Sequence, residues 1–243
     1  MPIHEQWVDS GGVRLHCLES VPLEPTTQVP LLVVPGVFGN AEDYVGEMSR
    51  LAPRPCCAVS LRGRGRSDVP ASGYRLEDHV SDIAATVAQW GFERPAMMGY
   101  AIGAAYAIAY AVDAPDKISA LIIGDYPARY RTLSAKWVES ALESMGERAR
   151  PEVARALQRD SAQVSLWERL RSIRCPTAIM RGAQPGSMVT AEVEAKYQEH
   201  RPGIEIITLE NNGHELWRPD FDSYIEAIGD FLSHVDQMKS MNG

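Results

Sequence analysis

Short apolar runs alternate with longer amphipathic stretches along most of the chain. Six runs have the length of a strand that is buried on both faces: residues 30–34, 56–61, 96–99, 119–124, 177–180 and 204–209. Helical stretches follow several of them, at residues 76–90, 101–112, 191–200 and 220–235. The alternation predicts βαβ units, and therefore an α/β fold with a mostly parallel central sheet and helices on both of its faces.

Two segments depart from this rhythm. Residues 4–9 and 13–19, joined by a Gly-Gly turn, predict an antiparallel hairpin at the start of the chain. Residues 126–171 contain two helical stretches, at 133–145 and 152–158, but no convincing strand. We expect a small helical cap at 126–171 on a core formed by 1–125 and 172–243, although ordinary surface helices have the same periodicity.

Composition narrows the class of protein. The chain has 243 residues, 45% of them hydrophobic and 23% charged, which is typical of a globular protein and fits one domain. Its formal net charge of -8 argues against a nucleic-acid partner, because binding to a phosphate backbone depends on concentrated Lys and Arg. No apolar stretch approaches the roughly 20 residues that cross a bilayer, and the first residues do not resemble a signal peptide. We expect a cytoplasmic protein that is not in a membrane.

The sequence predicts no cofactor. The four cysteines lack the spacing of metal ligands, and the chain has no GxGxxG after its first parallel strand, no P-loop and no HExxH. A small-molecule substrate is the expected partner, with no metal, nucleotide or flavin.

The most specific local pattern lies between the strand at 96–99 and the helix that follows it. It reads Gly99-Tyr100-Ala101-Ile102-Gly103. In a G-x-S-x-G nucleophile elbow the central residue occupies a strained turn, and the glycines leave room for the neighbouring strand and helix. Ala101 has no hydroxyl to attack a carbonyl, so this motif alone is also compatible with a glycine-containing strand-to-helix turn.

Three further motifs accompany the elbow. Residues 35–39 read PGVFG, residues 60–68 read SLRGRGRSD, and residues 211–215, after the last strand, read NNGHE. With these motifs the chain resembles the α/β-hydrolase superfamily over residues 31–232. The first is similar to the HGxxG loop with Pro in place of His, the second to DxRGxGxSD, and the third to the loop that presents the catalytic histidine.

The resemblance implies a set of roles. His214 corresponds to the catalytic base and position 101 to the nucleophile. The backbone N–H groups of Val37 and Ile102 correspond to the oxyanion hole, where a helix N-terminus favours negative charge. The arginines of 60–68 are expected to pair with nearby acids.

The triad acid is less firmly indicated. Many family members carry it after the penultimate strand, but residues 181–187 contain no carboxylate. Asp125 ends the strand before the expected cap and is our choice, since an acid there would hold one tautomer of the imidazole. Asp125 as a strand-end cap, and Glu215 or Glu210 as the acid, are the alternatives.

If the nucleophile were serine, the resemblance implies cleavage of an ester, lactone or thioester through an acyl-enzyme, and the family's carbon–carbon bond hydrolases share the same elbow. An aromatic set would suit an apolar or aromatic acyl group, although each member could equally be a packing residue. The set is Phe38, Tyr100, Tyr126, Trp137, Trp167 and Trp217.

Three hypotheses explain the alanine. In the first, Ala101 is an engineered replacement of serine in a serine hydrolase, which leaves this chain inactive. In the second, the chain is a natural enzyme that uses His214 and Asp125 as a base, for an elimination, a cyclisation or a cofactor-free oxygenation. In the third, it is a non-catalytic binding protein that keeps the pocket.

Overall fold

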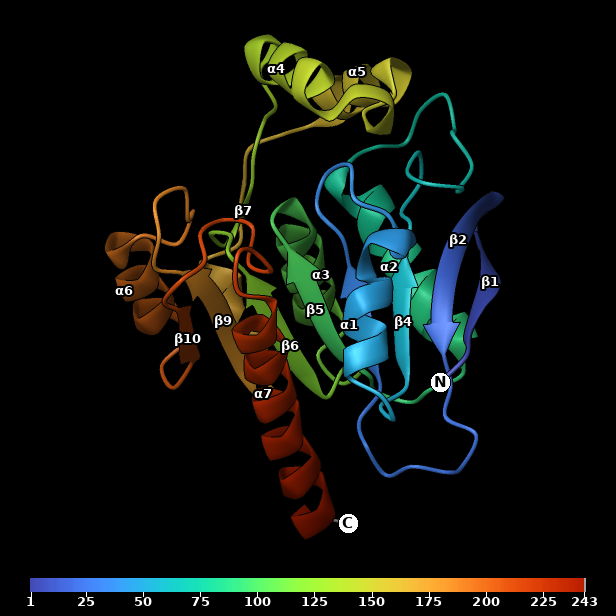
Figure 1. Ribbon diagram of the computed structural model, residues 1–243. Helices are drawn as coiled ribbons and strands as arrows, with labels where there is room; N and C mark the ends of the chain where they lie inside the picture. The colour runs from blue at the N-terminus through green and yellow to red at the C-terminus, as the bar shows by residue number, and fades with distance from the viewer. Residues whose placement is uncertain (243) are drawn as a thin grey trace.

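An eight-stranded sheet forms the centre of the computed structural model, which describes residues 1–242 (Figure 1). The strands lie in the order β1-β2-β4-β3-β5-β6-β9-β10, and every pair from β4 to β10 is parallel. The N-terminal hairpin joins antiparallel through β2. The predicted mostly parallel sheet is therefore confirmed. Its strands are β1 (Ile3–Ser10), β2 (Val13–Ser20), β3 (Leu31–Val34), β4 (Cys56–Val59), β5 (Ala96–Tyr100), β6 (Ala120–Gly124), β9 (Thr177–Gly182) and β10 (Glu205–Leu209).

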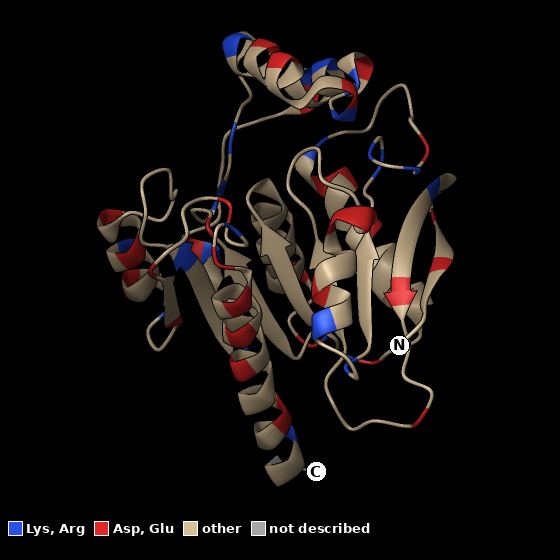
Figure 2. Ribbon diagram, viewed as in Figure 1, with Lys and Arg blue, Asp and Glu red and all other residues tan. Residues whose placement is uncertain are grey.

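Helices cover both faces of the sheet because the central strands are apolar on both sides. Along β3, Leu32 and Val34 belong to one core cluster, and Leu31 and Val33 belong to the other. The first cluster contains side chains of α2 (Leu76–Trp90), α3 (Ile102–Asp113) and α6 (Ala191–His200), and the second those of α1 (Val45–Arg50) and α7 (Phe221–Asn242). Figure 2 shows the charged residues on the helices and loops around central strands that carry almost none.

The turn η1 (Ala41–Tyr44) and helix α1 were not predicted. Together they cover only ten residues in two helical forms, which is too short for a clear 3.6-residue period. The turn η1 lies beside β4 and β2, and α1 continues from it. Within residues 1–242, no helix has the length and apolar character needed to cross a membrane.

The segment at residues 126–171 leaves the sheet after β6 and returns before β9. It contains β7 (Arg129–Tyr130), α4 (Ala135–Met145), η2 (Gly146–Arg148), α5 (Pro151–Asp160) and β8 (Val164–Ser165), and η3 (Glu168–Ser172) follows. Helices α4 and α5 lie beyond one end of the sheet (Figure 1). The antiparallel pair β7–β8 was not predicted, since two-residue strands show no periodicity. The division into core and cap remains a prediction.

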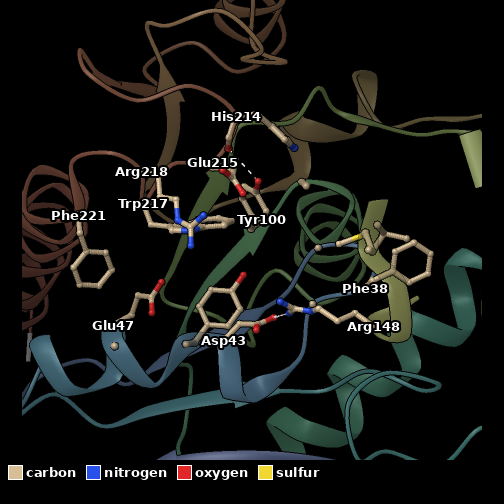
Figure 3. Close-up of a pocket in the computed structure, with 17 residues that line it drawn as sticks. Phe38, Asp43, Glu47, Tyr100, Arg148, His214, Glu215, Trp217, Arg218 and Phe221 are labelled. Atoms are coloured by element: carbon tan, nitrogen blue, oxygen red, sulfur yellow. Dashed lines mark hydrogen bonds and ion pairs between the residues drawn. The ribbon is translucent and has the colours of Figure 1, made fainter. Parts of the chain in front are cut away.

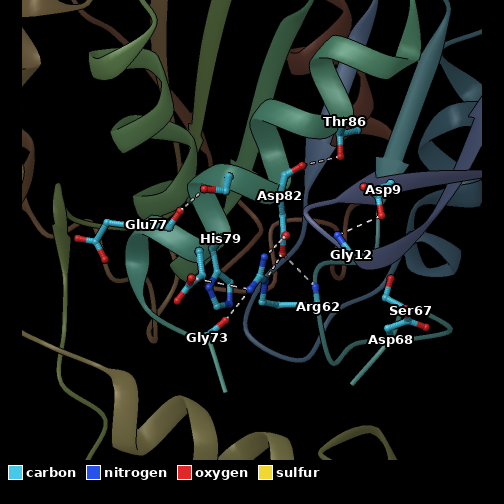
Figure 4. A network of polar contacts seen from close by, with 12 residues as sticks. Asp9, Gly12, Arg62, Ser67, Asp68, Gly73, Glu77, His79, Asp82 and Thr86 are labelled. Atoms are coloured by element: carbon cyan, nitrogen blue, oxygen red, sulfur yellow. Dashed lines mark hydrogen bonds and ion pairs between the residues drawn. The ribbon is translucent and has the colours of Figure 1, made fainter. Parts of the chain in front are cut away.

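Two arginines tie the segment at residues 60–68 to its neighbours, and Figure 4 shows one of them, Arg62, beside Asp82. Arg62 donates from Nη2 and Nε to the two oxygens of Asp82, at 2.6 and 2.9 Å, and both side chains are buried. Arg64 differs from the expectation of acidic partners. It donates to the carbonyl of Val37 at 2.8 Å and lies 2.8 Å from Nε2 of the buried His79. One arginine thus anchors the loop to α2, and the other supports residues 35–39.

We predict that Asp82→Asn lowers the free energy of unfolding by about 3–5 kcal/mol, because it leaves the Arg62 charge buried without its partner. Asp116→Asn is the control, since it breaks the exposed Arg174–Asp116 pair at 3.3 Å and should cost less than about 1 kcal/mol. Urea unfolding curves measure both values. Equal small losses for the two variants would contradict the importance of the buried pair.

Candidate active site

Ala101 occupies a sharp turn between β5 and α3. Its backbone has φ 50° and ψ -129°, and its N–H donates to the carbonyl of Gly124 at 2.9 Å. A non-glycine residue held in such a conformation costs about 1–3 kcal/mol, and residues of this kind cluster at functional sites. The turn is the geometry that the elbow motif predicts.

The glycines beside this turn permit close approach of backbone segments. A Cβ at Gly103 would lie 2.3 Å from the carbonyl oxygen of Pro35, and one at Gly99 would lie 2.6 Å from Cα of Ala104. A Cβ at Gly36 would lie 3.6 Å from Cβ of Ala101. The loop at residues 35–39 therefore packs on the N-terminus of α3 and borders position 101.

Among residues 1–242, several backbone N–H groups at this junction donate to no protein acceptor, and those of Val37 and Ile102 are two of them. Ile102 is the first residue of α3, so its N–H has no partner within the helix. The peptide that follows Val37 is fixed by Arg64, which donates to the Val37 carbonyl.

His214 and Asp125 meet although 89 positions separate them in the sequence. Nδ1 of His214 lies 2.7 Å from Oδ2 of Asp125, and the Asp125 side chain is fully buried whereas that of His214 is 33% exposed. A proton on Nδ1 satisfies this bond and leaves Nε2 as an acceptor. The contact with Asp125 thus fixes the position of Nδ1 in the imidazole ring.

Asp125 is held by a segment that the sequence analysis passed over. Ser187 donates its hydroxyl to Oδ1 at 2.5 Å, and the amides of Met188 and Val189 donate to the carboxylate at 2.9 and 3.2 Å. The loop after β9 lacks a carboxylate of its own, as its sequence indicates, but it supplies three donors to a carboxylate on β6. Main-chain donors leave no signal in a sequence pattern.

A cavity of about 700 Å³ opens beside Ala101 and His214 (Figure 3). Three of the six predicted aromatic residues line it: Phe38, Tyr100 and Trp217. The Tyr100 hydroxyl donates to the carbonyl of His214 at 3.0 Å, and its ring packs edge-on against Trp217 with centroids 4.9 Å apart. Burial raises the pKa of Tyr100, which keeps this phenol a donor that steadies the histidine loop.

The other three predicted aromatic residues, Tyr126, Trp137 and Trp167, are not part of the lining of this cavity. Tyr126 is 3% exposed and belongs to the core, and the ring of Trp167 packs on Tyr197 at 4.7 Å. Trp137 stacks on the ring of Phe38, behind the lining residue, with centroids 6.2 Å apart. These rings pack against other side chains. Residue type and position in the sequence do not distinguish such a packing residue from one that contacts a ligand.

Most of the charged lining of the cavity was missed by the sequence analysis, which named only Glu215, as an alternative acid. Asp43 and Glu47 come from η1 and α1, Arg148 from η2, and Glu215 and Arg218 from the loop after β10. Arg148 forms an ion pair with Asp43, which connects the segment at 126–171 to η1. No motif marks the other four residues, because separate parts of the chain supply them.

Glu47 is the buried member of this group, with 6% of its surface exposed. Burial raises the pKa of its carboxyl to about 7, and the charge of Asp43 adds to this increase. The folded state therefore binds a proton that the unfolded state has already lost between about pH 4.5 and pH 7. Stability falls as the pH rises through this interval.

We predict that Gly103→Ala lowers the free energy of unfolding by more than about 2 kcal/mol, because its Cβ would collide with the backbone of residues 34–35. Gly229→Ala in α7 is the control, since a Cβ there meets no atom within 4 Å, and it should stabilise by about 0.5–1 kcal/mol. Thermal unfolding of both variants tests the close approach. A neutral Gly103→Ala would contradict it.

We also predict that Glu47→Gln stabilises the chain at pH 8 by up to roughly 3 kcal/mol, because the pKa shift of the buried acid no longer costs stability. Near pH 4.5 the difference should disappear, since Glu47 is then protonated in the folded state. Urea unfolding at the two pH values measures it. A difference that does not depend on pH would show that ionisation of Glu47 is not its cause.

Two proteins that match almost the whole chain are named as a deformylase and a hydrolase. The chain is 25% identical over 262 residues to N-formylmaleamate deformylase of Pseudomonas putida, a match that covers 93% of this chain and 96% of the deformylase. It is 23% identical to 2-(acetamidomethylene)succinate hydrolase of Mesorhizobium japonicum, with 93% and 94% covered.

Solved structures agree on the fold. An esterase from Exiguobacterium antarcticum superposes with a TM-score of 0.78 at 19% identity, covering 95% of this chain and all of the esterase. An enol-lactonase from Burkholderia xenovorans superposes with a TM-score of 0.76 at 15% identity, covering 94% of this chain and all of the lactonase. The family model described as alpha/beta hydrolase fold matches residues 29–201. The chain belongs to the α/β-hydrolase fold family.

Proposed function

We propose that this site performs acyl transfer on a small carboxylic ester, lactone, thioester or amide when position 101 carries a hydroxyl. With Ala101 the chain binds such a compound but forms no acyl-enzyme. The proposed roles are nucleophile position for Ala101, base for His214, acid for Asp125, and oxyanion donors for the amides of Val37 and Ile102.

One observation carries the proposal: a strained alanine beside an oriented histidine. The turn at Ala101 costs about 1–3 kcal/mol and gives an alanine no interaction that a relaxed turn would lack. The Asp125–His214 bond of 2.7 Å and two uncommitted amides accompany this strain. All of these features serve a residue at position 101 that can attack a carbonyl.

The mechanism follows from these groups. A hydroxyl at position 101 gives its proton to Nε2 of His214 while its oxygen bonds to the acyl carbon, and the carbonyl oxygen becomes an oxyanion. The amides of Val37 and Ile102 bind that oxyanion, and Asp125 stabilises the imidazolium. The imidazolium then protonates the leaving group. Water, deprotonated by the same histidine, cleaves the acyl-enzyme and releases the acid.

The relatives support the breadth of this substrate class. Two are named for deformylation of N-formylmaleamate and for hydrolysis of 2-(acetamidomethylene)succinate, and a similar structure is an enol-lactonase. A cavity of about 700 Å³ is the size of ordinary small-molecule sites, and Phe38, Tyr100 and Trp217 offer apolar surface to an acyl group.

A second candidate has its own support. The His214–Asp125 pair is complete in a chain without the nucleophile, so it can act as a general base on an acidic substrate without a covalent intermediate. The present chain would then be active as it stands. The engineered-replacement and binding-protein hypotheses both predict that it is not.

We predict that Ala101→Ser produces a burst of nitrophenolate from 4-nitrophenyl acetate equal to the concentration of sites. Turnover should exceed that of the unchanged chain by about 10³-fold or more, because the variant supplies the missing nucleophile. Stopped-flow absorbance measures the burst.

The control is Ala101→Ser combined with His214→Ala, in which the burst should disappear although the fold is retained. An Ala101→Ser protein that is folded but no faster than the unchanged chain would contradict acyl transfer. Turnover of other substrates by the unchanged chain that is lost in His214→Ala alone would favour the second candidate.

A further inference from the structure

Glu47 is a buried carboxyl in the wall of the cavity. Only 6% of its surface is exposed. It lies on α1, outside the sequence motifs. Figure 3 shows its side chain projecting from α1 toward the space that Arg218 and Phe221 face from another wall. The proposed acyl-transfer chemistry makes no use of it.

Among residues 1–242, no other residue forms an ion pair or a hydrogen bond with the Glu47 side chain; only its own backbone N–H supports the carboxylate. Asp43, one turn earlier in the chain, is instead engaged by Arg148 and by the amide of Asn40 at 3.0 Å. A largely buried carboxylate without a counter-charge is costly, so a cation that reached Glu47 from the cavity would be favoured.

The charged and titratable groups around the cavity do not supply that partner. Acidic side chains outnumber basic ones along the lining, and one of the two arginines, Arg148, is neutralised by Asp43. Burial, together with Asp43, raises the pKa of Glu47 to about 7. The groups that surround Glu47 or share the cavity with it are Asp43 and Tyr44 of η1, Tyr100 of β5, Tyr224 of α7, Arg148 of η2, and His214, Glu215 and Arg218 of the loop after β10.

We propose that Glu47 is a specificity-determining residue that binds a protonated amine on the non-reacting part of the substrate. The inference rests on the proposed function for the identity of the reacting end, and it names the substrate class as amino-substituted acyl compounds. A ligand ammonium would supply the charge and the hydrogen bonds that the chain itself does not give to this carboxylate.

The charge of Glu47 distinguishes ligands that carry an ammonium group from ligands that carry a carboxylate. The relatives are named for compounds that are carboxylic acids. In this cavity an ionised Glu47 would repel a ligand carboxylate that approaches α1, although Arg218 on another wall would attract one. Because Glu47 in the empty cavity takes up a proton below about pH 7, an ammonium ligand must displace that proton at low pH. Affinity for the cation should therefore rise with pH and level off above pH 8.

The experiment uses the unchanged Ala101 chain and three esters of similar size: methyl 6-aminohexanoate, methyl heptanoate and monomethyl pimelate. They carry a cation, no charge and an anion on the same ester. Isothermal titration calorimetry at pH 8 should show the amine bound about tenfold more tightly than the uncharged ester, and the pimelate most weakly. Between pH 8 and pH 6 the affinity for the amine should fall about tenfold, as expected for one group that titrates near pH 7.

Two variants test whether Glu47 causes the preference for the amine. Glu47→Gln should remove the tenfold preference and its pH dependence while the uncharged ester binds as before. Glu42→Gln is the matched control, since it removes a carboxylate of η1 that lies outside the cavity and near His16, and it should keep the preference. Binding needs no turnover, so a failure of Ala101→Ser to cleave esters would leave this result standing.

Three outcomes would overturn the proposal: tightest binding of the pimelate, equal binding or absence of binding for all three esters, or an amine preference that persists in Glu47→Gln. The comparison of the three esters on the unchanged chain does not depend on either variant being folded.

Discussion

The bond between Asp125 and His214 is the interaction on which the site depends. It joins the end of β6 to the loop after β10 at 2.7 Å, and its carboxylate also accepts from Ser187 and from two amides of the loop after β9. Since the parallel strands β6, β9 and β10 end at one edge of the sheet, a single buried carboxylate can organise three loops there. The direction of the imidazole follows from this arrangement.

The second constraint is the close contact around position 101. Gly103 lets the backbone of Pro35 lie against α3, and Arg64 fixes the carbonyl of Val37 from the other side. The elbow, the loop at 35–39 and the segment at 60–68 thus contact one another, although they come from different βα connections. The strained backbone of Ala101 persists because these neighbours leave the turn no other conformation.

The elements and motifs with strong local signals could be predicted from the sequence. Apolar runs gave the buried strands, and the spacing of Gly99, Ala101 and Gly103 located the sharp turn. Asp125 could be placed at the end of β6 and His214 in the loop after β10, and the structure brings the two together.

What could not be predicted depends on tertiary contacts. Main-chain donors at residues 187–189 have no pattern, and α1, which presents Glu47, is too short for periodicity. The predicted aromatic residues have different surroundings in the structure: Tyr100 and Trp217 border the cavity, while Trp167 packs on α6. The roles of these residues depend on their burial and on their contact partners, which residue type alone does not reveal.

The most direct test of the account is whether the site aims a nucleophile at an electrophile. An alkyl fluorophosphonate should label the Ala101→Ser protein once, and mass spectrometry should locate the adduct on the peptide that contains position 101, with no adduct on the unchanged chain. Labelling at another residue, or none in a folded Ala101→Ser protein, would contradict the claim that His214, Asp125 and the two amides converge on position 101.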